Sequence, residues 1–373
     1  MGVLADLLKA GSTGTPQTFT TPDADGRALT TVIEGAHDAS DYEAILRACD
    51  HDPSRLRFGA PPSVYVRWKA DGTKATTYRY KLEAKPEPTS LEPIIEQVKA
   101  VHFTKPENAG GAHWFVFQAG DMQLGKRSRD GGTEEIVARY VDSVQNAVDE
   151  YQNLKRHGIA GIQVAFAGDC IEGIVSQGGK NTWLTQETIT EQTRILRRLM
   201  LQTVEAFAPL TDHLLVDTVN GNHDESQRAY NTYPGDGWAT ECAIAVADAL
   251  EMNPSAYGHV EVRVPDKWSG SLTAPVGDTL VTLAHGHQWS RGKGMGWLKD
   301  QDFGRQVARG TQVLQHGHIH TWELETTRDV VRVASPTYDC GSDWFREIRG
   351  GDAKRGGLAY LLKSGEVSRM SLV

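Results

Sequence analysis

Five apolar runs of the chain share one kind of ending, and this feature limits the possible folds more than any other. The runs are WFVFQAG, IQVAFAG, HLLVDTVNG, TLVTLAHG and TQVLQHG. Each leads into glycine and a carboxylate, amide or imidazole side chain, in Gly120–Gln123, Gly168–Glu172, Asn220–Asp224, His285–His287 and Gly317–His320. Apolar runs of this length are typical of buried strands, and loops at strand ends carry the sites of α/β proteins.

Helical patterns lie between these runs. We expect one helix to be capped by Thr133 and to stop at Gly158, a second to run from about Thr185 to Phe207, and a third to start near Asp236 and close before Pro254. Strands that alternate with long helices indicate an α/β architecture.

The side chains at the five endings suit a divalent metal. Carboxylate, amide and imidazole groups are all ligands for ions such as Mn²⁺, Fe²⁺ or Zn²⁺. One such ending occurs by chance, but five in a row at strand ends point to a shared site. Glycine beside each ligand lets the chain turn sharply and lets a bound group approach the backbone.

In order, the endings resemble the motifs of the calcineurin-like metallophosphoesterase superfamily, which are DxH, GDxxD, GNH[DE], a lone His and GHxH. The resemblance covers about residues 113–340. It implies a four-layer α/β/β/α sandwich that binds two divalent metal ions and hydrolyses phosphate esters. We expect Mn²⁺, with Mg²⁺, Fe²⁺ and Zn²⁺ as alternatives.

The resemblance also implies a role for each matching residue. One ion is expected on Asp121, Gln123, Asp169 and His320. The other is expected on Asp169, Asn222, His285 and His318, so that Asp169 bridges the two. His223 is the expected catalytic residue above the ions, and Glu172 is expected to orient it.

Gln123 departs from the family pattern, which has histidine at this position. An amide oxygen is a harder and weaker ligand than imidazole and favours Mn²⁺ or Mg²⁺ over Zn²⁺. Because the other ligand positions match, we expect an active enzyme. The non-enzyme alternative is a binding protein with a degenerate metal site.

The N-terminal part has a different composition. We predict a flexible leader over residues 1–30, a small α+β module over 31–90, a linker over 91–112 and the phosphoesterase domain over 113–373. The module combines a short helix over 41–49 with a β-hairpin around Asp71-Gly72. Residues 43–85 carry nine Lys or Arg against five Asp or Glu, a net +4 in a chain of −9. This charge fits either a nucleic-acid-binding module or a solvated hairpin face.

Substrate preference is the least determined property. The loop after His285 and a later segment combine aromatic and basic residues, of which we single out His287, Arg291, Lys293 and Arg346 as candidate substrate contacts. The long helix between the first two motifs resembles the nuclease branch that processes broken DNA ends, and also phage-encoded phosphoesterases. A DNA exo- or endonuclease is therefore the first hypothesis, and a nucleotide or cyclic-nucleotide phosphodiesterase is the second.

Other expectations concern context. The net charge of −9 argues against a protein that coats nucleic acid with positive surface. No apolar run approaches a membrane span and no signal-peptide pattern is present, so a cytoplasmic protein is expected. The DNA-end nucleases of the superfamily work with an ATPase, which makes such a partner an expectation here. The sequence leaves the oligomeric state open, a homodimer included.

Overall fold

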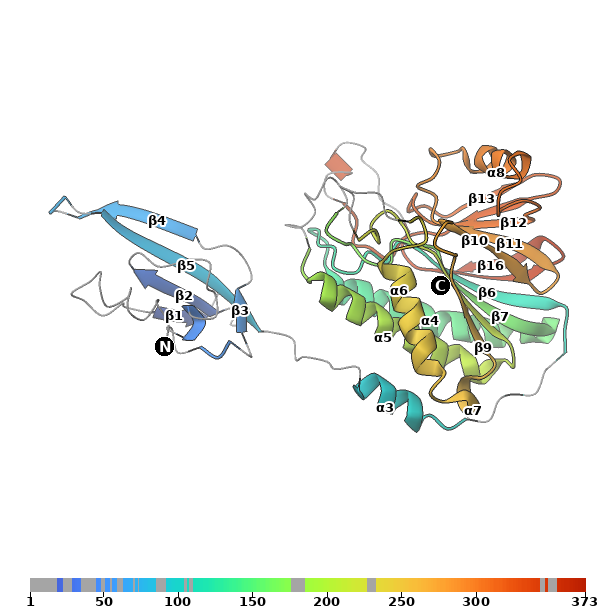
Figure 1. The fold of residues 1–373 in the computed structure, drawn as a ribbon, viewed down its shortest axis with the longest axis horizontal. Helices are drawn as coiled ribbons and strands as arrows, with labels where there is room; N and C mark the ends of the chain where they lie inside the picture. The colour runs from blue at the N-terminus through green and yellow to red at the C-terminus, as the bar shows by residue number, and fades with distance from the viewer. Residues whose placement is uncertain are drawn as a thin grey trace. The chain divides into compact units, whose positions relative to one another are not determined.

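The computed structural model contains two compact units, Met1–Thr89 and Ser90–Val373 (Figure 1). It describes residues 19–22, 29–34, 45–47, 51–53, 56–58, 63–69, 71–72, 74–84, 92–103, 106, 110–175, 185–226, 233–342, 346–347 and 354–373. Most of the predicted leader and residues 85–91 fall outside these ranges.

The first unit is built on a five-stranded sheet. Its strands are β1 (Phe19–Pro22), β2 (Leu29–Glu34), β3 (Leu56–Phe58), β4 (Ser63–Trp68) and β5 (Lys74–Ala84). The order is β1-β2-β5-β3, and β4 also pairs with β5. The antiparallel pair β4–β5 is the hairpin predicted around Asp71-Gly72. The helix predicted over 41–49 is described only at Ile45–Arg47, which is helical.

One feature of this unit differs from the sequence prediction. Strand β1 lies inside the segment that we predicted as a flexible leader, because it pairs with β2 along its length. The polar, threonine-rich composition of these residues concealed the pairing. In addition, all of β4 is solvent-exposed, including Trp68 at 74 %, whereas Tyr80 on β5 is fully buried.

The second unit contains two stacked sheets. The first has six strands in the order β16 (Glu366–Leu372), β15 (Leu358–Lys363), β6 (His113–Ala119), β7 (Ile159–Phe166), β8 (Leu214–Thr218) and β9 (Val260–Arg263). The second has five, in the order β10 (Ser271–Val276), β11 (Thr279–Ala284), β12 (Val313–His316), β14 (Val331–Ala334) and β13 (Glu323–Thr326). The neighbours β6–β7, β7–β8, β11–β12 and β12–β14 are parallel, so their carboxyl ends point the same way within each sheet.

Helices cover the outer faces of both sheets (Figure 1). On the first sheet lie α4 (Thr133–Leu154), α5 (Ile189–Phe207) and α6 (Trp238–Leu250), with the short α7 (Pro254–Tyr257) beside them, and α8 (Gly294–Phe303) lies on the second. Separate apolar clusters fill the interfaces between layers. Phe117 belongs to the cluster between the first sheet and helices α4, α5 and α6. Val116 packs with Val313 and Val333 between the sheets, and Leu298 packs with Leu314 under α8. The second unit is therefore a four-layer α/β/β/α sandwich, as predicted.

Helix boundaries follow local chemistry. Thr188 caps α5 by accepting a hydrogen bond from the Glu191 backbone N–H, so the helix begins four residues later than expected. The N-cap of α4 is Gly132, not Thr133, and the Glu135 carboxylate accepts from the Gly132 N–H at 2.7 Å.

The predicted linker contains a packed helix, α3 (Glu92–Ala100). Val98 is buried in the main core, and the Asn253 side chain donates to the carbonyls of Val98 and Val101. The proline-rich flank suggested a linker, whereas the hydrogen bonds that fix this helix come from Asn253, 152 and 155 positions away from the residues that it contacts. None of the helices in the described part of the chain combines the length and apolar character needed to span a membrane.

Candidate metal centre

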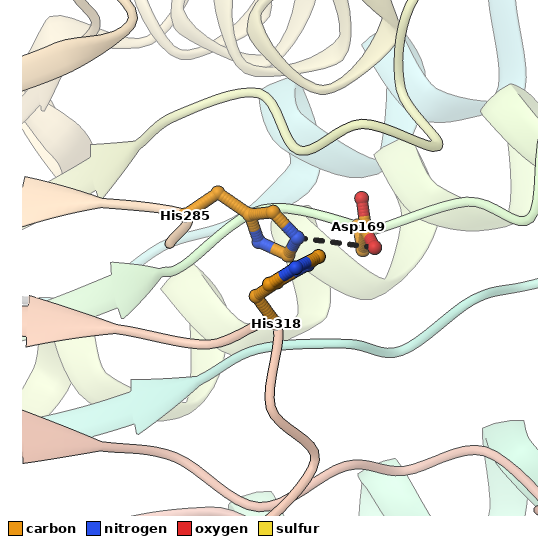
Figure 2. A group of neighbouring side chains, drawn as sticks. All are labelled: Asp169, His285 and His318. Atoms are coloured by element: carbon orange, nitrogen blue, oxygen red, sulfur yellow. Dashed lines mark ion pairs between the residues drawn. The ribbon is translucent and has the colours of Figure 1, made fainter. Parts of the chain in front are cut away.

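The candidate ligands come from the ends of five strands in two sheets. Asp121 follows β6, Asp169 follows β7 and Asn222 follows β8, all in the first sheet, while His285 follows β11 and His318 follows β12 in the second. Asp169, His285 and His318 each offer a ligand atom within 4.8 Å of the others. Figure 2 shows the two imidazole rings converging on the Asp169 carboxylate, with His285 Nε2 3.1 Å from Asp169 Oδ2.

The backbone at the site adopts an unusual conformation. Five of the candidate residues have φ between 47° and 69°, namely Asp121, Gln123, Asp169, His318 and His320. Left-handed backbone is uncommon for residues with a side chain and concentrates at functional sites. The sharp turns at the strand ends aim these side chains back over the sheet edges.

Backbone amides hold the two aspartates. The His318 N–H donates to Asp121 Oδ2 at 2.7 Å, and the His223 N–H donates to Asp169 Oδ1 at 2.8 Å. Glycine is required for this approach: a Cβ on Gly221 would lie 2.0 Å from Asp169 Oδ1, and one on Gly317 would lie 2.4 Å from Asp121 Oδ2. The glycines in the motifs therefore make room for the carboxylates.

His285 is oriented for binding a metal through Nε2. Its Nδ1 lies 2.8 Å from the Ala167 carbonyl oxygen, which can only accept, so Nδ1 is protonated and Nε2 is the nitrogen that a metal can bind once its own proton is released. Among the described residues, buried His285 Nε2 and Asp121 Oδ1 make no hydrogen bond of normal geometry. Such atoms are rarely left in a protein interior. A carboxylate–imidazole set with unsatisfied buried atoms fits a divalent ion.

The charges of the site shift several pKa values. Burial alone would lower the pKa of His285, but Asp169 and Asp121 outweigh it and raise the value to about 9. Burial opposes ionisation of Asp169, yet His285 and His223 hold its pKa well below the ordinary range. A divalent ion would compete with the proton for the same nitrogen.

His223 and Glu172 lie together beside Asp169. His223 Nδ1 is 2.9 Å from the Glu172 carbonyl oxygen and 3.3 Å from its carboxylate, and His223 Nε2 is 3.9 Å from Asp169 Oδ2. The ring is thus anchored through Nδ1 with Nε2 directed to the site. Burial would lower its pKa, but Asp169 and Glu172 raise it to about 9.

The remaining ligand predictions have a different environment. His320 lies between two carboxylates, with Nε2 3.2 Å from Asp121 Oδ1 and Nδ1 3.4 Å from Asp339 Oδ2. The Gln123 side-chain oxygen accepts a hydrogen bond from the Lys126 ammonium. His320 therefore contacts both Asp121 and Asp339, whereas the side-chain oxygen of Gln123 is engaged with Lys126.

Sequence analysis missed three residues of this network. Asp224 accepts hydrogen bonds from the backbone N–H groups of Gly221 and Ile171, so it ties two strand-end loops together. Asp339 and Lys126 form an ion pair beside His320. Asp339 follows β14, a strand parallel to β12, so this strand end could have been recognised as a sixth part of the site. Asp339 lies five residues beyond the end of β14, however, and has no glycine before it, so it lacks the pattern shared by the other five endings.

The candidate substrate contacts fall into two groups. His287 lies near the metal-binding group, with its ring centroid 5.5 Å from that of His285 and 6.3 Å from that of His318. Arg291 forms an ion pair with Glu323, and Arg346 forms one with Asp130. Lys293 is exposed at the start of α8. Trp344 and Phe345, noted in the same segment as Arg346, are outside the described residues.

Neither a protein-family model nor a curated protein matches the chain. Solved structures do show similarity. A predicted phosphoesterase from Streptococcus pneumoniae TIGR4 has 11 % identity and a TM-score of 0.31, covering 68 % of this chain and 84 % of that one. An archaeal phosphodiesterase has 11 % identity and a TM-score of 0.32, covering 69 % and 99 %. Vps29 of Entamoeba histolytica, solved with Zn²⁺, has 13 % identity and a TM-score of 0.28, covering 69 % and 98 %. At these scores, inference about function depends on the site itself.

Proposed function

We propose that this chain is a metal-dependent phosphodiesterase. The observation that carries the proposal is the group of buried Asp169, buried His285 and half-buried His318 at the carboxyl ends of parallel strands, with Asp121 beside it. Mn²⁺ is the ion we expect, because the set mixes carboxylate and imidazole donors. A divalent ion held there would polarise a phosphate ester as a Lewis acid and activate a water molecule.

The chain's own groups would then bind and orient the ester. His223, anchored through Nδ1, directs Nε2 toward the position where a phosphate oxygen would lie, and can hold or deliver a proton there. Glu172 fixes the ring and Asp224 fixes the loops that carry it. These contacts set the orientation of the reacting groups before substrate arrives, which is a main source of enzymatic rate.

For the substrate we propose DNA. On one face of the β4–β5 hairpin, the register brings Ser63 opposite Arg79 and Tyr65 opposite Thr77, and Arg67 follows on the same face. The Arg79 guanidinium lies over the Tyr65 ring, 5.5 Å from its centroid. We call the exposed residues Tyr65, Arg67, Lys69, Arg79 and Lys81 the basic face. Cations with an exposed aromatic ring suit a phosphate backbone and a stacked base.

A second candidate function is supported by a cavity of about 720 Å³ next to the metal-binding group. Its lining includes Gly221 and His287, and also Tyr233 and Trp268. The last two rings meet edge to face at 4.7 Å, with Lys267 over both. A nucleobase could stack there while its phosphate lies at the metal, which favours a nucleotide or cyclic-nucleotide phosphodiesterase.

A substrate panel separates the two functions. We would assay bis(p-nitrophenyl) phosphate, labelled single- and double-stranded DNA, mononucleotides and cyclic dinucleotides, each with Mn²⁺ and with chelator. We expect DNA cleavage that chelator abolishes. Turnover of a small nucleotide with no DNA cleavage would replace the first proposal by the second. Absence of any turnover with Mn²⁺, Mg²⁺, Fe²⁺ or Zn²⁺ would favour the degenerate binding protein. The ATPase partner and the oligomeric state stay predictions.

A further inference from the structure

Lys126 brings a positive charge into the candidate metal centre. It lies three residues after Gln123, and its backbone N–H donates to the Gln123 carbonyl at 3.0 Å. Its ammonium donates to the Gln123 side-chain oxygen and forms an ion pair with Asp339. The side chains of Lys126 and Asp339 are only 13 % and 1 % exposed. A lysine this deep in a protein is rare unless a carboxylate compensates its charge.

This position coincides with the expected first ion. Of the ligands expected there, Gln123 already accepts from Lys126, and His320 is held between Asp121 and Asp339. In the second group, His285 Nε2 faces another expected ligand of the same ion, Asp169 Oδ2, at 3.1 Å. Among the His, Cys, Asp and Glu side chains of the described residues, Asp169, His285 and His318 form the one set of three whose ligand atoms converge.

The two expected ion positions also differ in the charge that lies beside them. The Lys126 ammonium forms an ion pair with the buried Asp339 carboxylate, and a lysine paired with a carboxylate carries its charge at neutral pH. A second divalent ion on Gln123 would face this charge at short range in a site from which water is largely excluded. Like charges at that range repel strongly in a low-dielectric interior.

We infer that the Lys126 ammonium takes the place of the first divalent ion, so that the chain binds one ion, at Asp169, His285 and His318. Gln123 then serves Lys126 as a hydrogen-bond acceptor, which explains an amide where the resembling family has an imidazole. The inference revises the expectation of two ions. Its consequence for catalysis, a lysine charge beside a bound phosphate, rests on the proposed function, whereas the number of ions does not.

The test counts ions on the full chain without substrate. Chelator-treated protein is loaded with excess Mn²⁺, passed through gel filtration to remove weakly held ions, and analysed for Mn²⁺ by elemental analysis and electron paramagnetic resonance. We expect one Mn²⁺ per wild-type chain, with the spectrum of an isolated ion. Asp169→Asn should retain almost none. Two ions per wild-type chain, or the spectrum of a coupled Mn²⁺ pair, would overturn the inference.

Substitutions of the lysine make the test specific. Lys126→Met removes the charge at similar length and should raise the count toward two, with a coupled-pair spectrum. Lys126→Arg keeps a cation and should stay at one. Because Lys126→Met removes the lysine partner of the buried Asp339 and leaves it His320 as its ion-pair partner, the double variant Lys126→Met/Asp339→Asn serves if the single variant does not fold. A count of one in a folded Lys126→Met or double variant would contradict the inference.

The outcome is distinguishable from failure of the proposed function. One ion per wild-type chain with no turnover of any phosphodiester keeps the inference and rejects the function. Two ions with rapid turnover reject the inference and keep the function.

Discussion

The two units place their charged residues in opposite ways. In the sandwich, the carboxylates of the candidate centre and His285 are buried, its other histidines are half-buried, and the Asp121 and Asp169 carboxylates accept from backbone amides. In the N-terminal unit, the basic face lies on an exposed strand pair, and the buried apolar cluster of Ile45 and Tyr80 with Phe58 and Tyr78 is small. Buried, constrained groups can carry out chemistry, whereas exposed flexible cations can bind and release a long polyanion.

The difference also concerns stability. A large core between layers supports the strained left-handed turns at Asp121 and Asp169, because surrounding packing must compensate that strain. The N-terminal sheet carries no comparable strain in its described residues and has a strand, β4, that is exposed along its whole length. The proposal that the sandwich hydrolyses the ester while the N-terminal unit binds DNA can therefore be tested by disrupting each unit separately.

The largest effect is expected from Asp169→Asn. This substitution removes a carboxylate that converges with His285 and His318 and that anchors the His223 N–H. We expect loss of bound metal and a fall of roughly 1,000-fold or more in bis(p-nitrophenyl) phosphate hydrolysis. Steady-state kinetics with Mn²⁺ measures the fall in hydrolysis. The matched control is Asp278→Asn, the same change at an aspartate outside the candidate centre. Wild-type turnover in Asp169→Asn would remove the metal centre from the mechanism.

Charge reversal of the basic face comes second. Replacing Arg67, Lys69, Arg79 and Lys81 by Glu should weaken DNA binding by roughly 100-fold and flatten its salt dependence, because several phosphate contacts are lost. Hydrolysis of the small diester should change less than about twofold, since that substrate makes no such contacts. Equal loss on both substrates would mean that the hairpin supports folding and not DNA binding. Anisotropy titrations at several salt concentrations measure the effect.

Most of the sandwich could be predicted from the sequence. The strands that carry the site are continuous apolar runs, and their endings repeat one local chemistry, so the order of elements and the position of the centre followed directly. Helix α3 was missed because long-range contacts, and not local composition, fix it. Strand β1 was missed because its polar composition concealed its pairing with the neighbouring strand β2.

The candidate centre was predictable only where a motif marked it. Asp224 sits within a motif, but its role as a link between two loops depends on backbone positions that no pattern reveals. Lys126 and Asp339 are 213 positions apart, and only the approach of two sheets brings them together. Gln123 was recognised as a departure, whereas its partner was not, because the sequence cannot show which side chain its oxygen faces.

A third prediction tests the small core of the N-terminal unit. Leu82→Ala removes a buried side chain of β5 and should lower the stability of this unit by about 2–5 kcal/mol. Val66→Ala, at an exposed position of β4, is the matched control and should change stability by no more than about 0.5 kcal/mol. Thermal unfolding followed with and without Mn²⁺ separates the units, because only the sandwich should be stabilised by the ion. Equal destabilisation of both units by Leu82→Ala would show that they unfold together.

The smallest effect concerns pH. Without metal, the pKa of His285 is raised to about 9, so its Nε2 carries a proton at pH 7 that a bound ion must displace. Asp169 is already ionised, because its pKa is held below the ordinary range. Mn²⁺ affinity should therefore rise with pH, by about tenfold at most between pH 7 and 8, and level off above the pKa of His285.

Calorimetric Mn²⁺ titrations in two buffers of different ionisation enthalpy should show about one proton released per ion at pH 7 and fewer near pH 9. His102→Ala, an exposed histidine of the same chain, should leave both quantities unchanged. An affinity that is constant from pH 6.5 to 9 would mean that His285 does not bind the ion through the nitrogen that faces Asp169.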